Sequence, residues 1–160
     1  QEAIEPAAQR RAESMLLTRS DLPKGWQPHE GGVGVTGGCL GGDYSAFTLI
    51  GTAQGDVLQD DKEGDGRVLS VGQVFATEEM AAEGLEILAD EVEREGVERC
   101  VIDQLSQDPA APEIGADIRE ISVPPPSGVD EARAWLTTIT YDEEPFTAYD
   151  QMVVLRDGTP

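Results

Sequence analysis

Residues 77–105 read TEEMAAEGLEILADEVEREGVERCVIDQL, and this stretch decides the fold prediction. Thr77 can cap a helix start, and Glu78 and Glu79 fall in the first turn, where negative charge suits the helix dipole. Gly96 interrupts the pattern, so we expect a kink or a break there between two shorter helices. The apolar side chains at helical spacing are Ala81, Leu85, Leu88, Ala89 and Val92, then Val97, Cys100, Val101 and Leu105.

Strand-like segments lie on both sides of the helical stretch. Alternation of side chains is clearest in residues 132–141, as expected of a strand in a sheet. A short amphipathic helix is expected at 7–17. This order predicts an α+β fold, in which one twisted antiparallel sheet of about five strands carries helices on one face. The expected strands are 47–53, 67–75, 114–123, 132–141 and 148–156.

The length of the chain indicates a single domain. A chain of 160 residues can bury a sizeable core, so we expect one α+β domain over 1–160. Residues 1–13 are a candidate flexible or tethering segment. Because the chain starts at Gln1 without a methionine, we expect that a targeting segment has been removed. At the other end, Asp157-Gly158 is a hairpin-turn signal, so we expect either that the protein continues beyond Pro160 or that this terminus is unusual.

The chain contains two cysteines, and they indicate a disulfide. Cys39 lies in the glycine-rich segment 37–42, and Cys100 lies on the apolar side of the expected helix. Two cysteines far apart in sequence, without CxxC spacing and without a neighbouring histidine, favour one structural disulfide. Disulfides persist in oxidising compartments, so the pair predicts an extracellular or cell-envelope location.

The charge of the chain is strongly negative. Acidic residues number 32 against 11 basic ones, a formal charge of −21. Such a chain is repelled by phosphate backbones and anionic membranes, so nucleic acid is not an expected partner. The acids are dispersed, which favours a role in solubility; a face that binds cations or a basic partner is the alternative.

No expected apolar segment is long enough to span a membrane. The longest apolar runs have four residues, against the roughly 20 that a spanning helix needs. We therefore expect contact with a membrane only through a tether that this sequence does not include.

Catalytic chemistry is sparse. The one histidine, His29, lies in an expected loop, where a solvated side chain is the favoured interpretation. The sequence places no serine on a nucleophile elbow beside it, and the glycine-rich segment 31–38 lacks the strand, helix and Lys-Ser/Thr of a phosphate-binding loop. We expect no cofactor and no enzymatic activity; a hydrolase is the least favoured alternative.

One acidic segment partly matches a calcium loop. Asp61, Glu63 and Asp65 alternate and are followed by Gly66, as in the first half of such a loop. The twelfth position of the match is Gly72 rather than glutamate. A solvated acidic connection between two strands is therefore the favoured interpretation, with calcium binding as the alternative.

Four aromatic residues border expected loops or strand ends. Tyr44, Tyr141, Phe146 and Tyr149 are candidates to line a ligand groove, although packing at the rim of the core is the more common use of such residues. The groove would be formed by the sheet together with the loops 27–43 and 124–130.

The segment 16–26, LLTRSDLPKGW, resembles one found in secreted actinobacterial proteins, often lipoproteins or extracellular sensor-like domains. The order of later features is similar as well: a cysteine, a strand with Gly51-Thr52-Ala53, a strand ending at Val74-Phe75, and a helix leading to the second cysteine. In plan the chain is similar to the extracellular sensor domain of mycobacterial PknH-type receptor kinases, an α+β sandwich with a cleft. The resemblance implies an envelope location and a binding role.

Two functions are therefore expected. The first is a non-enzymatic, secreted or membrane-tethered domain of an actinobacterial-type envelope, which binds an envelope ligand or a partner protein. The alternative is a structural or accessory subunit of a larger surface assembly, docked through the strand that includes residues 152–156.

Overall fold

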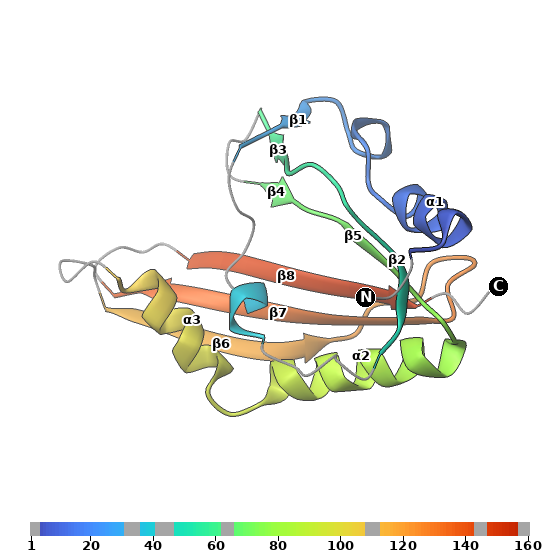
Figure 1. Cartoon of the computed structure of the whole chain (residues 1–160). Coiled ribbons are helices and arrows are strands. Elements are labelled where there is room, and N and C mark those ends of the chain that lie inside the picture. Colours follow the sequence, from blue (N-terminus) through green and yellow to red (C-terminus); the bar gives the residue numbers. More distant parts are fainter. Residues whose placement is uncertain are drawn as a thin grey trace. The chain divides into compact units, whose positions relative to one another are not determined.

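The computed structural model describes residues 4–30, 36–40, 47–61, 66–107, 113–142 and 147–156 (Figure 1). Their contacts divide the chain into two compact units. Unit 1 is Gln1–Val33 with Ser45–Ala81, and unit 2 is Gly34–Tyr44 with Ala82–Pro160. The chain length predicts one domain over 1–160, in which the two units would unfold together, and this stays a prediction.

The strands form three separate antiparallel sheets. Mixed helix and strand content and antiparallel pairing are confirmed, whereas the expectation of one sheet of about five strands is corrected. The expected strand 67–75 is divided at residues 69–70, and its two halves pair with different partners. The sheets are β1 (Trp26–Pro28), β3 (Leu58–Asp60) and β4 (Arg67–Val68); β2 (Leu49–Gln54) and β5 (Val71–Phe75); and β6 (Ile114–Ile121), β7 (Glu131–Tyr141) and β8 (Thr147–Arg156).

In unit 1, helix α1 (Pro6–Ser14) packs directly against β2 and β5. Its buried residues are Ala8 and Ala12, and two strand glycines lie opposite them. A Cβ atom at Gly51 would overlap the carbonyl oxygen of Ala8, and one at Gly72 would overlap that of Ala12. Helix and strands meet backbone to backbone because all four residues are small. From Pro6 onward, the candidate tethering segment 1–13 is thus a packed helix.

The chain after α1 is held by a short 3₁₀-helix and a contact with the sheet. At the start of the 3₁₀-helix Arg19–Asp21, the Asp21 carboxylate accepts hydrogen bonds from the backbone N–H and the hydroxyl of Thr18. These bonds lower the pKa of Asp21. The backbone N–H of Leu17 donates to the hydroxyl of Ser70, at the division between β4 and β5, over 2.9 Å.

In unit 2, two helices cover one face of the β6-β7-β8 sheet (Figure 1). They are α2 (Glu78–Glu93, in unit 2 from Ala82) and α3 (Val97–Leu105). The predicted cap is confirmed, because the backbone N–H of Met80 donates to the hydroxyl of Thr77 over 3.2 Å. The predicted break is also confirmed: Gly96 has a φ of 103°, which a residue with a side chain rarely adopts. In the described part of the chain, no helix combines the length and apolarity needed to cross a bilayer.

The predicted disulfide between Cys39 and Cys100 is present, with Cα atoms 5.8 Å apart. Cys39 ends a second 3₁₀-helix (Thr36–Cys39), and its side chain is buried against Val97 and Val101 of α3. In sequence, residues 34–44 interrupt unit 1. The disulfide therefore fixes this inserted segment to the helix layer of unit 2.

Substitution Gly72→Ala is expected to lower the free energy of unfolding by about 1–3 kcal/mol, because the added carbon forces α1 away from the sheet. Equilibrium denaturation measures this change. Gly66→Ala is the matched control, since a Cβ atom there meets nothing closer than the Trp26 ring at 3.4 Å, an ordinary contact. Equal stability of the two variants would show that α1 does not pack as described.

Reduction of the disulfide is expected to cost about 2–4 kcal/mol, because the bond closes a loop between cysteines 61 residues apart. The measurement is the denaturation midpoint with and without reductant. A variant with both Cys39→Ala and Cys100→Ala serves as the control, and its midpoint should not respond to reductant. Mass spectrometry that found both thiols free in the unreduced protein would contradict the bond.

Candidate functional site

The face of the β6-β7-β8 sheet under the helices is filled by core side chains. Trp135 of β7 is 1% exposed and packs with Leu85, Ala89 and Val92 of α2. Its ring N–H has no hydrogen-bond partner among the described residues. On the same face of β8, Met152 and Val154 pack against this cluster. This face is therefore the core of unit 2.

The margin of this core carries a cluster of charged side chains around Arg133. Its guanidinium lies over the Trp135 ring, 5.2 Å from the ring centre, and is within 4 Å of three carboxylates. The shortest contact is the hydrogen bond from Arg133 Nε to Glu120 Oε1 at 2.9 Å. This bond is the main cause of the lowered pKa of Glu120 and of the raised pKa of Arg133. The other two carboxylates are those of Glu86, at 3.7 Å, and Glu93, at 3.6 Å.

This cluster contributes to the packing of the fold. Its one cation, the Arg133 guanidinium, is already paired with carboxylates and is not available to an anionic ligand. One guanidinium faces three carboxylates, so the local charge stays negative. The aromatic ring and the carboxylates hold Arg133 in place, with 20% of its side chain exposed. Sequence reasoning missed it because its members are far apart in the chain and share no motif.

The opposite face of the same sheet presents apolar side chains to solvent. Side chains alternate along a strand, so the residues of β8 that are odd-numbered point away from Met152 and Val154. Three of them are large and apolar, and about half or more of each is exposed. We call them the β8 row: Tyr149 (67%), Val153 (46%) and Leu155 (50%).

The β8 row lies on a strand whose second edge is open. Among the described residues, β8 pairs only with β7, in continuous register from Glu131↔Arg156 to Thr140↔Thr147. Natural edge strands are often protected by proline, by bulges or by several charges. Over Thr147–Arg156 there is no proline, the register contains no bulge, and only two residues are charged. The edge therefore has the features of a surface that can accept another strand.

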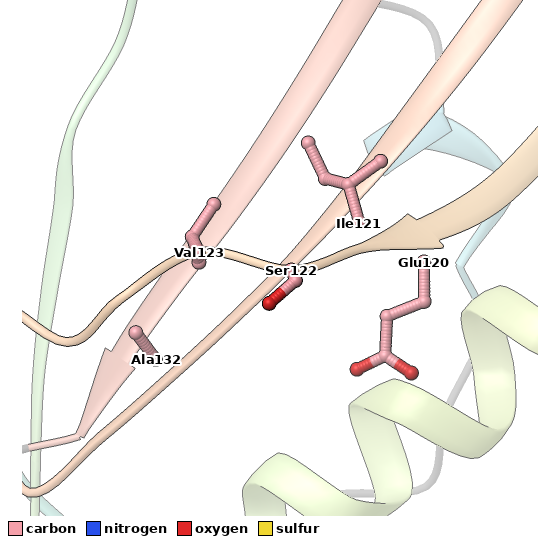
Figure 2. Close-up of a pocket in the computed structure, with 5 residues that line it drawn as sticks. All are labelled: Glu120, Ile121, Ser122, Val123 and Ala132. Carbon is pink, nitrogen blue, oxygen red and sulfur yellow. The ribbon is translucent and has the colours of Figure 1, made fainter.

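A shallow hollow of about 370 Å³ lies where β6 ends and β7 begins. Figure 2 shows the carboxylate of Glu120 directed toward a helix, while the hydroxyl of Ser122 points elsewhere. The Glu120 carboxylate is bound by Arg133, so it is not placed to activate this serine. The lining residues, Glu120, Ile121, Ser122, Val123 and Ala132, supply no nucleophile paired with a base.

The aromatic groove candidates are only partly described. Tyr141 is half-buried at the end of β7 and belongs to the face that carries Trp135. Tyr149 is paired with Thr138 and belongs to the opposite face, so these two tyrosines do not line one groove. Tyr44 and Phe146 lie outside the described residues. Of the two groove loops, 124–130 is described, whereas much of 27–43 is not.

The calcium candidate is also only partly described. Asp61 is an exposed turn residue whose backbone N–H donates to the carbonyl of Gly25, and Glu63 and Asp65 lie outside the described residues. Within the described ranges, no three His, Cys, Asp or Glu side chains are grouped so that they could hold a metal ion. The backbone N–H of His29 donates to the carbonyl of Val57, an interaction of the main chain alone.

Comparisons of the chain with protein-family models, with curated proteins and with solved structures found no match.

Substitution Arg133→Met is expected to raise the pKa of Glu120 toward its ordinary value, because the hydrogen bond from the guanidinium is what lowers it. A carboxyl with a lowered folded-state pKa stabilises the fold above its unfolded pKa, and this stability is lost as pH falls through the folded pKa. The unmodified protein should therefore lose stability more than the variant as pH falls below about 4.5, the ordinary pKa. NMR titration of the Glu120 carboxyl and melting curves measure both effects.

Arg99→Met is the matched control for this prediction. Arg99 pairs with Asp103 at 3.1 Å on the exposed surface of α3 and is not among the groups that shift the pKa of Glu120. Its loss should leave the titration of Glu120 unchanged. An unchanged titration in Arg133→Met as well would show that Arg133 and Glu120 are not paired.

Proposed function

We propose that this chain is a non-enzymatic binding domain of an actinobacterial-type cell envelope, secreted or tethered to a membrane. It would bind an envelope ligand or a partner protein on the face of unit 2 that carries the β8 row. The observation that supports this most directly is the exposure of Tyr149, Val153 and Leu155 together on one strand. Contiguous exposed apolar side chains on a folded domain are typical of interaction surfaces.

The disulfide supports the location. Bonds of this kind form and persist in oxidising compartments and are rare in the cytosol. The Cys39–Cys100 bond is largely buried at Cys39 and joins a 3₁₀-helix to α3, as a structural bond does. The resemblance of residues 16–26 to secreted actinobacterial proteins points in the same direction.

A binding role also agrees with how the reactive side chains are used. Both sulfur atoms are joined in the disulfide, so neither cysteine is a nucleophile. The partly exposed guanidinium of Arg133 and the carboxylate of Glu120 are joined by a hydrogen bond. The alternative function, a structural subunit of a surface assembly, draws on the same open edge of β8 and differs in that the partner would be permanent.

A ligand bound to the folded state is expected to stabilise it, by about 2.7 kcal/mol at a concentration of 100 times its Kd. The measurement is the melting temperature across a panel of envelope lipids, glycolipids and envelope protein fractions. A variant with Val153→Lys and Leu155→Lys should lose the shift. Val71→Lys, at an exposed valine of β5 in unit 1, should keep it.

Two results would count against the proposal: no shift with any member of the panel, or a shift that the double variant retains in full. Sedimentation of the chain alone separates the two functions. A stable assembly of the isolated chain would favour the structural subunit.

A further inference from the structure

We infer that the partner of unit 2 is an extended, basic segment of another protein, which adds as a fourth strand along the open edge of β8. This inference rests on the proposed function and names the chemistry of the partner. It follows from three features of the described residues: an unpaired edge, an apolar row on one face, and a strongly acidic layer on the other.

The first feature is the length and regularity of the open edge. Strand β8 runs for ten residues in unbroken register with β7, so its outer backbone groups are spaced regularly for a further strand. An added strand gains its affinity from these main-chain hydrogen bonds and its specificity from alternate side chains. Only a partner in extended conformation can form hydrogen bonds with the outer backbone groups along the whole length of β8.

The second feature decides what one face of the added strand carries. Side chains directly opposite on neighbouring strands lie about 4.5–5.5 Å apart, close enough to pack. On the face that carries Tyr149, Val153 and Leu155, the added strand would lie beside exposed apolar surface. Apolar side chains at alternate positions of the partner would cover that surface and remove it from water.

The third feature decides what the other face carries. That face lies on the side of the sheet covered by α2, because Met152 and Val154 of β8 pack against the α2 cluster. Helix α2 holds seven acidic residues and no basic one within Glu78–Glu93. The ranges of unit 2 hold twenty of the 32 acidic residues and five of the 11 basic ones. Basic side chains at the remaining positions of the partner would meet this negative field.

The charge also argues against a second copy of this chain as the occupant. Two copies would bring together surfaces that each belong to a molecule of formal charge −21. The strand that a second copy would supply, β8, has one basic residue, Arg156, which is already paired with Glu131 at 3.0 Å. A partner of opposite charge is therefore the occupant that the electrostatics favour.

The test uses the whole disulfide-bonded chain and a labelled peptide as long as β8, in which valine and lysine alternate. Fluorescence anisotropy measures binding, and amide hydrogen exchange locates it. We expect the peptide to bind and to protect amides of β8 from exchange. Its affinity should fall steeply as the salt concentration rises. The variant with Val153→Lys and Leu155→Lys should bind at least about tenfold more weakly, whereas Val71→Lys should bind as the unmodified chain does.

Two control peptides separate strand addition from charge alone. A valine–glutamate peptide should not bind, and a peptide with the same lysines but prolines in place of the central valines should lose the protection of β8. Equal binding of the proline peptide, or protection outside β8, would overturn the inference. So would a salt-independent dimer of the chain that protects β8, since a second copy would then be the occupant.

The outcome also distinguishes this inference from the proposed function. If the valine–lysine peptide does not bind while a member of the envelope panel stabilises the protein through the β8 row, the inference fails and the proposed function stands. If neither the peptide nor any member of the panel has an effect, both fail.

Discussion

The bond between Cys39 and Cys100 is the constraint on which the organisation of unit 2 depends. Residues 34–44 lie in sequence between two pieces of unit 1, and within the described part of this segment Cys39 and Leu40 pack against the helices of unit 2. The covalent bond to Cys100 adds to this packing, because it removes chain entropy from the unfolded state. It requires an oxidising compartment to form.

Side chains alternate along β7 and β8, so one face of the sheet packs against the helices while the other face is presented to solvent. Met152 and Val154 of β8 pack with the Trp135 cluster, while Tyr149, Val153 and Leu155 face away and leave apolar surface exposed. A shift of one residue in the pairing would exchange the two sets and expose the core. The ten-residue register with β7 prevents this, so the stability of the core also fixes which side chains are presented.

Much of the structure of this unit could be predicted from sequence patterns, because each pattern depends on interactions between residues that are close in sequence. The Thr77 cap, the Gly96 break, the strand 132–141 and the cysteine pair each follow from spacing within one segment or from composition. The division of 67–75 could not be predicted, since it depends on which distant strand pairs with each half. The Arg133 cluster was missed for the same reason, because its charged side chains come from three different elements, α2, β6 and β7.

The net charge explains how an open apolar edge can persist on a folded protein. An unprotected edge strand normally invites copies of the same chain to pair, which leads to aggregation. Here every approaching copy carries the same formal charge of −21, so association between like molecules is opposed before the edges meet. The same field attracts a basic chain and accelerates its encounter. One property of the sequence therefore opposes self-association and favours the basic partner that we propose.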